Sequence, residues 1–166
     1  MLYIFGGLPG TGKTVLSREL ARQRRAVHLR IDTIEQALRS AGHMLRGPEG
    51  YRVAYEIAAD NLRLGQAVVA DSVNPLPVTR EAWLTVAQRC GVPWVEIELI
   101  CSDRAEHRRR VESRSSDVPG LRLPSWTEVV EREYAAWDRP HVVVDTAGQT
   151  VEESVAVLFR AFKPGV

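Results

Sequence analysis

The chain alternates short apolar runs with longer stretches in which apolar residues recur every three or four positions. Short apolar runs predict buried strands, and a period near 3.6 predicts helices that pack by one face. We expect five strands, at residues 2–5, 26–30, 67–70, 93–100 and 141–145. We expect seven helices, at residues 13–23, 33–40, 50–64, 79–90, 103–114, 125–137 and 150–162, the sixth starting with a capping box at Ser125 and Glu128.

Strands that alternate with helices in this order are typical of an α/β fold, with a parallel sheet between two layers of helices. Ligands of such sheets bind at the carboxyl ends of the strands, so we expect functional residues directly after each strand. Two carboxylates occupy such places, Asp32 and Asp71. The sequence shows no repeat or linker, which favours one domain over residues 1–166.

The segment "GLPGTGKT" at residues 7–14 fits the P-loop (Walker A) pattern, between a predicted strand and a predicted helix. A glycine-rich turn aims several backbone N–H groups at one anion, and the following helix adds its positive end. The lysine supplies a point charge for the phosphates, and the last hydroxyl is suited to Mg²⁺. A turn without a ligand is the alternative, but its position favours ATP with Mg²⁺, bound by Gly7, Pro9, Gly10, Thr11, Gly12, Lys13 and Thr14.

Composition narrows the class of protein. Among 22 basic residues only Lys13 and Lys163 are lysines, which singles out Lys13 within the P-loop. The net charge of +1 gives no argument for nucleic acid as a partner, although it does not exclude it. No apolar run reaches the ~20 residues that cross a bilayer, so we expect no membrane partner. Two cysteines, Cys90 and Cys101, without a signal-peptide pattern favour the cytoplasm.

Each residue placed after a strand has two interpretations. Asp32 suits a helix N-cap or a general base for an attacking hydroxyl, and Arg30 either pairs with it or contacts substrate. Asp71 suits Mg²⁺, directly or through water, or a cap on the next segment. Asn74 suits a substrate contact or a structural role in its loop.

The stretch "DRAEHRRRVESR" is rich in arginine, and a solvated helix face with internal ion pairs is one interpretation. However, Arg110 and Arg114 are four residues apart and therefore share a helix face. Two guanidinium groups on one face suit the stabilisation of a transferring phosphoryl group. With the following loop, we expect a small helical lid at about residues 103–124 that closes over the site and excludes water.

These segments, "GLPGTGKT", "RIDTI", "VVADSVNPLPVTREAW" and "RRRVESR", together resemble the small P-loop kinases related to polynucleotide 5′-hydroxyl kinases. This group of AAA-type ATP-binding kinases includes chloramphenicol phosphotransferase, gluconate kinase and zeta-type toxin kinases. The resemblance implies a P-loop NTPase fold with a five-stranded parallel sheet. It also implies Asp32 as the base, Asp71 as the acid of the third strand, Arg110 and Arg114 as lid arginines, and Thr146 and Ala147 beside the adenine.

We therefore predict an ATP-dependent phosphotransferase that moves the γ-phosphoryl group to a hydroxyl of a small molecule. Residues 33–64 and 71–80 are expected to form the acceptor pocket, with Arg46 and Tyr51 as candidate contacts. A 5′-hydroxyl polynucleotide or nucleotide kinase is one alternative. An ATP-binding switch or ATPase is another, whereas a Ras-like GTPase would carry N-K-x-D, which does not occur. The sequence identifies neither the acceptor nor whether the protein is a monomer or a dimer.

Overall fold

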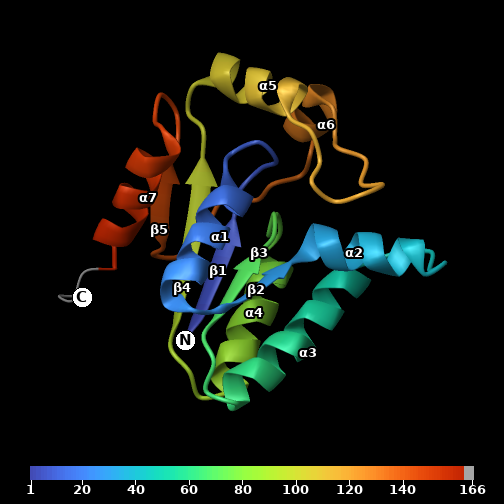
Figure 1. Ribbon diagram of the computed structural model, residues 1–166, viewed down its shortest axis with the longest axis vertical. Coiled ribbons are helices and arrows are strands. Elements are labelled where there is room, and N and C mark those ends of the chain that lie inside the picture. The colour runs from blue at the N-terminus through green and yellow to red at the C-terminus, as the bar shows by residue number, and fades with distance from the viewer. Residues whose placement is uncertain (163–166) are drawn as a thin grey trace.

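A computed structural model describes residues 1–162; Lys163 and the last three residues of the predicted domain lie outside the described residues. The five predicted strands are confirmed. They are β1 (Leu2–Gly6), β2 (Val27–Arg30), β3 (Val68–Asp71), β4 (Trp94–Ile100) and β5 (Val142–Asp145). All pair in parallel, in the order β2-β3-β1-β4-β5 (Figure 1).

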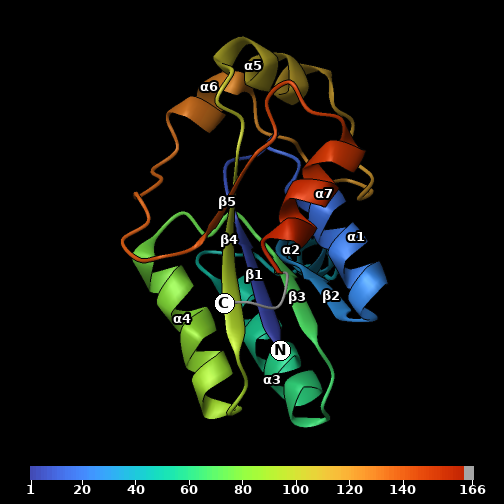
Figure 2. The same ribbon diagram turned by 90° about the vertical axis from the view of Figure 1, so that its left-hand side faces the viewer.

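Helices cover both faces of the sheet, which confirms the α/β prediction. Figures 1 and 2 show α1 and α7 on one face, and α3 and α4 on the other. Two more helices, α5 and α6, lie beyond the carboxyl ends of the strands. The bounds are α1 (Lys13–Arg24), α2 (Ile31–Ser40), α3 (Glu49–Arg63), α4 (Pro77–Arg89), α5 (Arg104–Ser113), α6 (Trp126–Val130) and α7 (Val151–Arg160).

The central strand β1 is buried along its whole length and feeds two apolar cores. Leu2 and Ile4 pack into the cluster beneath α3 and α4, while Tyr3 and Phe5 pack into the cluster beneath α1 and α7. Side chains of a strand alternate between the faces of its sheet, so a strand covered on both sides is apolar throughout. Since β3 pairs with one edge of β1 and β4 with the other, the sheet's switch point falls directly after β1, at the P-loop.

The predicted helix at 125–137 is wrong beyond Val130. Its capping box between Ser125 and Glu128 is confirmed, but the helix has only five residues. The chain that follows runs past the fully buried Arg80 of α4. The Arg80 guanidinium donates to the carbonyl oxygens of Ala135 (2.6 Å) and Ala136 (3.0 Å), and the Ala135 N–H donates to the Pro75 carbonyl at 2.8 Å. These backbone groups bond to α4 and the loop before it, so they are not free to continue the helix.

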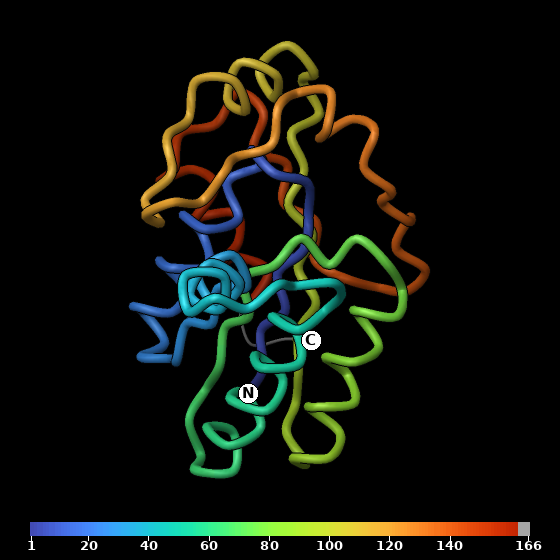
Figure 3. Tube along the Cα trace, turned by 90° about the vertical axis from the view of Figure 1, so that its right-hand side faces the viewer, coloured from blue at the N-terminus to red at the C-terminus, as the bar shows by residue number. Residues whose placement is uncertain are grey.

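The predicted lid lies over the carboxyl ends of the strands. Figure 3 shows the loop after α5 arching down toward α2. The N-cap of α5 is Asp103, whose side chain accepts hydrogen bonds from the N–H groups of Ala105 and Glu106. Within residues 1–162, every helix is too short or too polar to cross a lipid bilayer.

Candidate active site

The P-loop connects β1 to α1 and is held tightly against the predicted lid. Gly12, the N-cap of α1, has a φ of 90°, which glycine adopts without strain. Gly10 has a φ of 89°, and a Cβ added to it would lie 2.6 Å from a methyl carbon of Val111 on α5. His107 Nε2 lies 2.8 Å from the Pro9 carbonyl oxygen, and because that oxygen only accepts, Nε2 carries the proton. The backbone of the cradle therefore contacts α5 directly.

Lys13 lies at the first position of α1, with its ammonium group inside the cradle. Its residue is only 8% exposed, and Nζ donates to the Leu8 carbonyl at 2.8 Å. Burial lowers the pKa of Lys13 to about 8, although the carboxylates of Asp71 and Asp32 oppose this shift, and Arg114 adds to it. The loop therefore holds a desolvated cation that an anionic ligand would stabilise.

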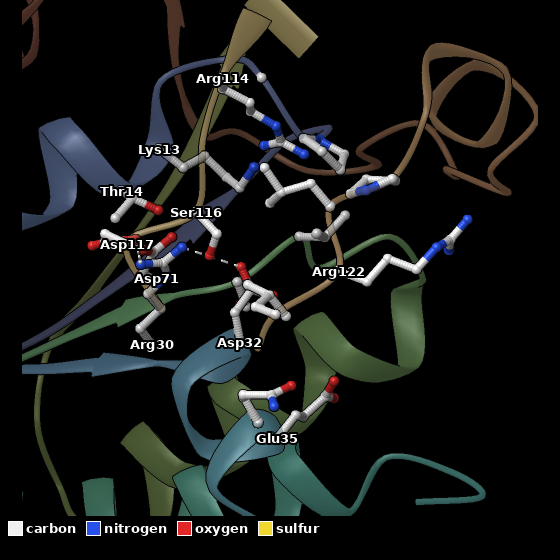
Figure 4. Close-up of a pocket in the computed structure, with 18 of the residues that line it drawn as sticks. Lys13, Thr14, Arg30, Asp32, Glu35, Asp71, Arg114, Ser116, Asp117 and Arg122 are labelled. Carbon is white, nitrogen blue, oxygen red and sulfur yellow. Dashed lines mark hydrogen bonds and ion pairs between the residues drawn. The ribbon is translucent and has the colours of Figure 1, made fainter. Parts of the chain in front are cut away.

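A pocket of about 760 Å³ lies at the carboxyl ends of the strands, beneath the predicted lid (Figure 4). Its size is in the range of small-molecule sites, roughly 300–1,000 Å³. It brings together most of the residues that the sequence marks as functional. These are Pro9, Gly10, Gly12, Lys13, Thr14, Arg30, Asp32, Asp71, Arg110 and Arg114.

Asp71 ends β3 and faces this pocket with a buried carboxylate. The residue is 3% exposed, and among residues 1–162 its Oδ2 has no hydrogen-bond partner. The nearest basic atom is His28 Nε2 at 3.8 Å, which lies 2.9 Å from the Ser17 hydroxyl; burial lowers the pKa of His28, against the pull of Asp71. A buried carboxylate oxygen without a donor suits a cation or its water. The N-cap of α4 is Leu76, so the capping interpretation of Asp71 is wrong.

Asp32 lies in the first turn of α2. That helix begins at Ile31, two residues before its predicted start, and its N-cap is Arg30, so the N-cap interpretation of Asp32 is wrong. The Asp32 side chain is 52% exposed and lines the pocket, with Arg30 Nη2 at 3.6 Å from its Oδ2. Figure 4 shows it across the pocket from Lys13 and Arg114. It is therefore an accessible carboxylate that faces two cations.

The two lid arginines reach the pocket in different ways. Since α5 ends at Ser113 and Arg114 continues in an extended conformation, they do not share a helix face as predicted. Arg110 donates to Glu106 (2.6 Å) and to the hydroxyl and carbonyl oxygens of Thr146 (both 2.8 Å). The Nε of Arg114 is buried without a partner among the described residues, and burial lowers the Arg114 pKa. Both line the pocket, but only Arg114 keeps its guanidinium free of a carboxylate in the described chain.

Four predicted nucleotide contacts are not among the residues that line the pocket. The N–H of Gly7 donates to the Val73 carbonyl (3.0 Å), and the hydroxyl of Thr11 donates to the Leu8 carbonyl (2.9 Å). Thr146 follows β5, and its hydroxyl is 3.2 Å from the Thr11 carbonyl. Ala147 is adjacent, with its N–H bonded to the Asp145 carboxylate at 3.0 Å. The bond between Thr146 and Thr11 joins the turn after β5 to the P-loop. A position beside the adenine stays a prediction for Thr146 and Ala147.

Three predicted substrate contacts do not line this pocket, so a substrate contact stays a prediction for each of them. Asn74 is fully buried and has a φ of 47°, and its amide donates to the Phe5 carbonyl at 2.7 Å, so it holds the loop after β3. The Tyr51 hydroxyl accepts from the Asn74 N–H at 3.2 Å, and burial raises the pKa of Tyr51 to about 12. Arg46 lies in the exposed loop before α3, with its guanidinium near Met44.

Sequence reasoning missed six charged residues of the pocket: Arg18, Glu35, Arg39, Asp117, Arg122 and Arg132. Asp117, in the loop after α5, accepts hydrogen bonds from both Arg18 and Arg30. These hydrogen bonds lower the pKa of Asp117 to about 2, and the bond from Arg30 has the largest effect. Arg18 is one helical turn beyond Thr14, which is a usable signal. Asp117 and Arg132 lie in irregular segments, where no periodicity indicates the direction of a side chain.

The fold and the site define a P-loop nucleotide-binding protein with a lid-like segment over its pocket. The chain belongs to the AAA domain family AAA_33, whose model matches residues 2–133, from β1 to the segment after α6. A comparison with curated proteins finds no match.

Solved structures share the fold over almost the whole chain, at sequence identities that support the fold alone. A proposed kinase from Chloroflexus aurantiacus matches with a TM-score of 0.71 and 22% identity, covering 96% of both chains. The Mycobacterium tuberculosis APS kinase CysC, in complex with AMPPNP and APS, gives 0.65 and 15%, covering 98% of this chain and 96% of that one. Chaetomium thermophilum Kti12, in complex with ADP-AlF3, gives 0.69 and 18%, covering 98% and 97%. The predicted likeness to small P-loop kinases is confirmed at the level of fold.

Proposed function

We propose that the protein is an ATP-dependent kinase that transfers the γ-phosphoryl group of ATP to a hydroxyl of a small molecule. One observation carries this proposal: an accessible carboxylate, Asp32, lines the same pocket as the P-loop lysine and as Arg114, a lid arginine with no carboxylate partner among residues 1–162. A protein that only binds nucleotide has no need of an acid opposite its phosphate site. A kinase needs one there to orient the hydroxyl and to accept its proton.

In this reaction the acceptor oxygen forms a bond to the γ-phosphorus, while the bond from that phosphorus to the bridging oxygen breaks and ADP leaves. The hydroxyl proton passes to the Asp32 carboxylate and from there to solvent. The negative charge on the transferring group lies between Lys13 and Arg114, which are both positioned before the reaction starts. Such preorganised charge is the main source of catalysis in phosphoryl transfer.

The residues at the phosphate end also suit a metal ion. The Thr14 hydroxyl and the unpartnered Asp71 carboxylate would hold Mg²⁺ or its waters. Bound there, Mg²⁺ would neutralise charge on the β- and γ-phosphates. Residues 1–162 contain no group of three His, Cys, Asp or Glu side chains placed to hold a metal ion by themselves. This is consistent with a cation whose remaining ligands are phosphate oxygens and water.

The acceptor side of the pocket is lined by α2 and residues 71–73, which belong to the predicted segments 33–64 and 71–80, and also by the loop of residues 115–124. The pocket's volume of about 760 Å³ suits a small molecule. That loop lines one side of it (Figure 4). Two neighbours in fold were solved with AMPPNP and with ADP-AlF3, which supports ATP as the donor. The fold is also shared with Kti12, so an ATP-binding switch is the alternative function.

A transfer screen tests the proposal. Purified protein, Mg²⁺ and ATP labelled in the γ-phosphate are incubated with sugars, antibiotics, nucleosides and 5′-hydroxyl oligonucleotides, and label in each alcohol is measured. We expect at least one small alcohol to be labelled and ATP turnover to rise many-fold in its presence. Lys13→Ala should abolish both, because it removes the point charge at the phosphates.

Exposed Arg52 of α3 offers a matched control, since Arg52→Ala removes a cation outside the pocket and should leave transfer unchanged. The kinase proposal is wrong if no alcohol is labelled while ATP turnover responds to a protein partner. It is equally wrong if Lys13→Ala transfers as fast as the wild type.

A further inference from the structure

The loop after α5 forms its ion pairs with the body of the protein through one carboxylate, that of Asp117. Asp117 accepts a hydrogen bond at 2.6 Å from Nη1 of Arg30, at the end of β2, and a second from Arg18 of α1. Figure 4 shows Asp117 beside Arg30, at the same side of the pocket as Asp71. Asp117 and Arg30 are 87 residues apart in the chain, so this bond depends on the lid being in place.

The rest of the loop fits the same position. The Ser116 hydroxyl accepts from the Val118 N–H at 3.0 Å, which folds a tight turn around Asp117. Further along, Gly120 packs against α2, where an added Cβ would lie 3.0 Å from the amide nitrogen of Gln36. The loop therefore docks on α1, β2 and α2 together, and Asp117 supplies its ion pairs to this docking site.

Arg30 is shared between Asp117 and the proposed base. Its Nη1 bonds to Asp117 at 2.6 Å, whereas its Nη2 lies 3.6 Å from Asp32 Oδ2, beyond hydrogen-bonding distance. The Arg30 side chain is only 10% exposed, and within the described chain it has no ion-pair partner besides Asp117 and Asp32. With Asp117 withdrawn, the charge of Arg30 would be balanced by Asp32, two residues away, through a direct hydrogen bond. Such a bond would occupy a carboxylate oxygen that the acceptor hydroxyl needs.

We propose that Asp117 is a positioning residue through which lid closure frees Asp32: it takes over the Arg30 guanidinium and leaves the Asp32 carboxylate open to the acceptor hydroxyl. This inference rests on the proposed function. Closure then does two things at once, because the loop covers the pocket and the base becomes available. Transfer is favoured only when the lid is closed, which limits the reaction of ATP with water.

The test is a rescue experiment on the alcohol that the transfer screen labels. Asp117→Asn keeps the size of the side chain and removes its charge. We expect kcat to fall about 10–100-fold, because Arg30 then occupies Asp32, part of the ~10²–10⁴-fold effect of general base catalysis. We expect the dissociation constant of MgAMPPNP to change by less than about threefold. In Asp117→Asn/Arg30→Gln the competing guanidinium is gone, so kcat should rise several-fold above that of Asp117→Asn.

A purely structural lid contact predicts the opposite pattern. In that case the two substitutions would each loosen the loop, and the double variant would be as slow as Asp117→Asn or slower. Arg18→Gln separates the two roles as well, since it removes an ion pair of Asp117 without touching Arg30, and it should slow transfer much less. Asp60→Asn, in an exposed ion pair with Arg63 on α3, is the matched control and should be neutral.

A second measurement needs no acceptor. Amide hydrogen exchange of residues 115–124 in the MgAMPPNP complex should be about tenfold faster in Asp117→Asn than in the wild type, because the loop loses its ion pairs. Equal exchange, or a double variant without rescue, would overturn the role of Asp117 while leaving the kinase proposal intact. If the wild type labels no alcohol, the kinase proposal fails and the role of Asp32 in this inference fails with it.

Discussion

At the scale of single residues, the account depends on Lys13, because burial lowers the pKa of its ammonium group. The pKa of Lys13 is lowered to about 8, so the free protein loses this charge as the pH rises through 8. Below that pH the ammonium is present and nucleotide binding should be constant. Above it the dissociation constant of MgADP should rise, by up to about tenfold per pH unit, because binding must also reprotonate Lys13.

Calorimetry from pH 6.5 to pH 9.5 measures this dependence. In Lys13→Met, binding should be weaker and almost independent of pH over the same range, since no titrating group remains at that position. A wild-type curve that stays flat through pH 9.5 would contradict the depressed Lys13 pKa.

Asp32 permits a second residue-scale prediction. Asp32→Asn keeps the side-chain size but removes the carboxylate that receives the proton, so transfer should fall by ~10²–10⁴-fold. MgAMPPNP should bind as in the wild type, since Asp32 is on the acceptor side of the pocket. Kinetics together with a binding isotherm separate these effects, and a loss of nucleotide binding would show that Asp32 has a structural role instead.

The residues that could be predicted are those attached to regular elements. Lys13, Asp32 and Asp71 each stand at the start of a helix or the end of a strand, so topology alone brings them to one edge of the sheet. Asn74 and Tyr51 also carry polar side chains near that edge, but both groups are bonded inward, which no sequence pattern indicates. Asp117 could not be found, because its partners lie far away in the chain.

At the scale of elements, the break after α6 shows how a tertiary contact overrides helix periodicity. Arg80 is fully buried, donates to carbonyl groups of residues 74, 75, 135 and 136, and lies 4.3 Å from the centre of the Trp137 ring. Such a residue joins α4 to the segment that carries Arg132 into the pocket. Nothing in the sequence of that segment indicates its contact with Arg80, which lies 55 residues before Ala135 in the chain.

Replacement of Arg80 should therefore destabilise the whole protein. Arg80→Met fills much of the volume but leaves several buried carbonyl groups without donors, and we expect a loss of roughly 3–5 kcal/mol in the free energy of unfolding. Urea unfolding followed by circular dichroism measures it. Arg52→Met, at an exposed position of α3, should change stability by less than about 0.5 kcal/mol, and a similarly small change for Arg80→Met would contradict the contact.

At the scale of the whole molecule, the sheet and the lid are held in place by different kinds of contact. The five strands and their alternation with helices could be predicted because short apolar runs that alternate with amphipathic helices are typical of a parallel sheet between two helical layers. The lid is held instead by a few polar contacts between distant segments, such as His107 with Pro9 and Asp117 with Arg30. Its position therefore follows from three-dimensional geometry that no local pattern encodes.

The central claim is that the pocket couples ATP cleavage to phosphorylation of an alcohol. The most direct measurement follows ADP, inorganic phosphate and phosphorylated alcohol in one reaction with the alcohol found by the screen. The account predicts one phosphorylated alcohol for each ADP, with little inorganic phosphate, and loss of both products in Lys13→Ala. Release of ADP and inorganic phosphate in equal amounts, at a rate unaffected by any alcohol, would contradict it.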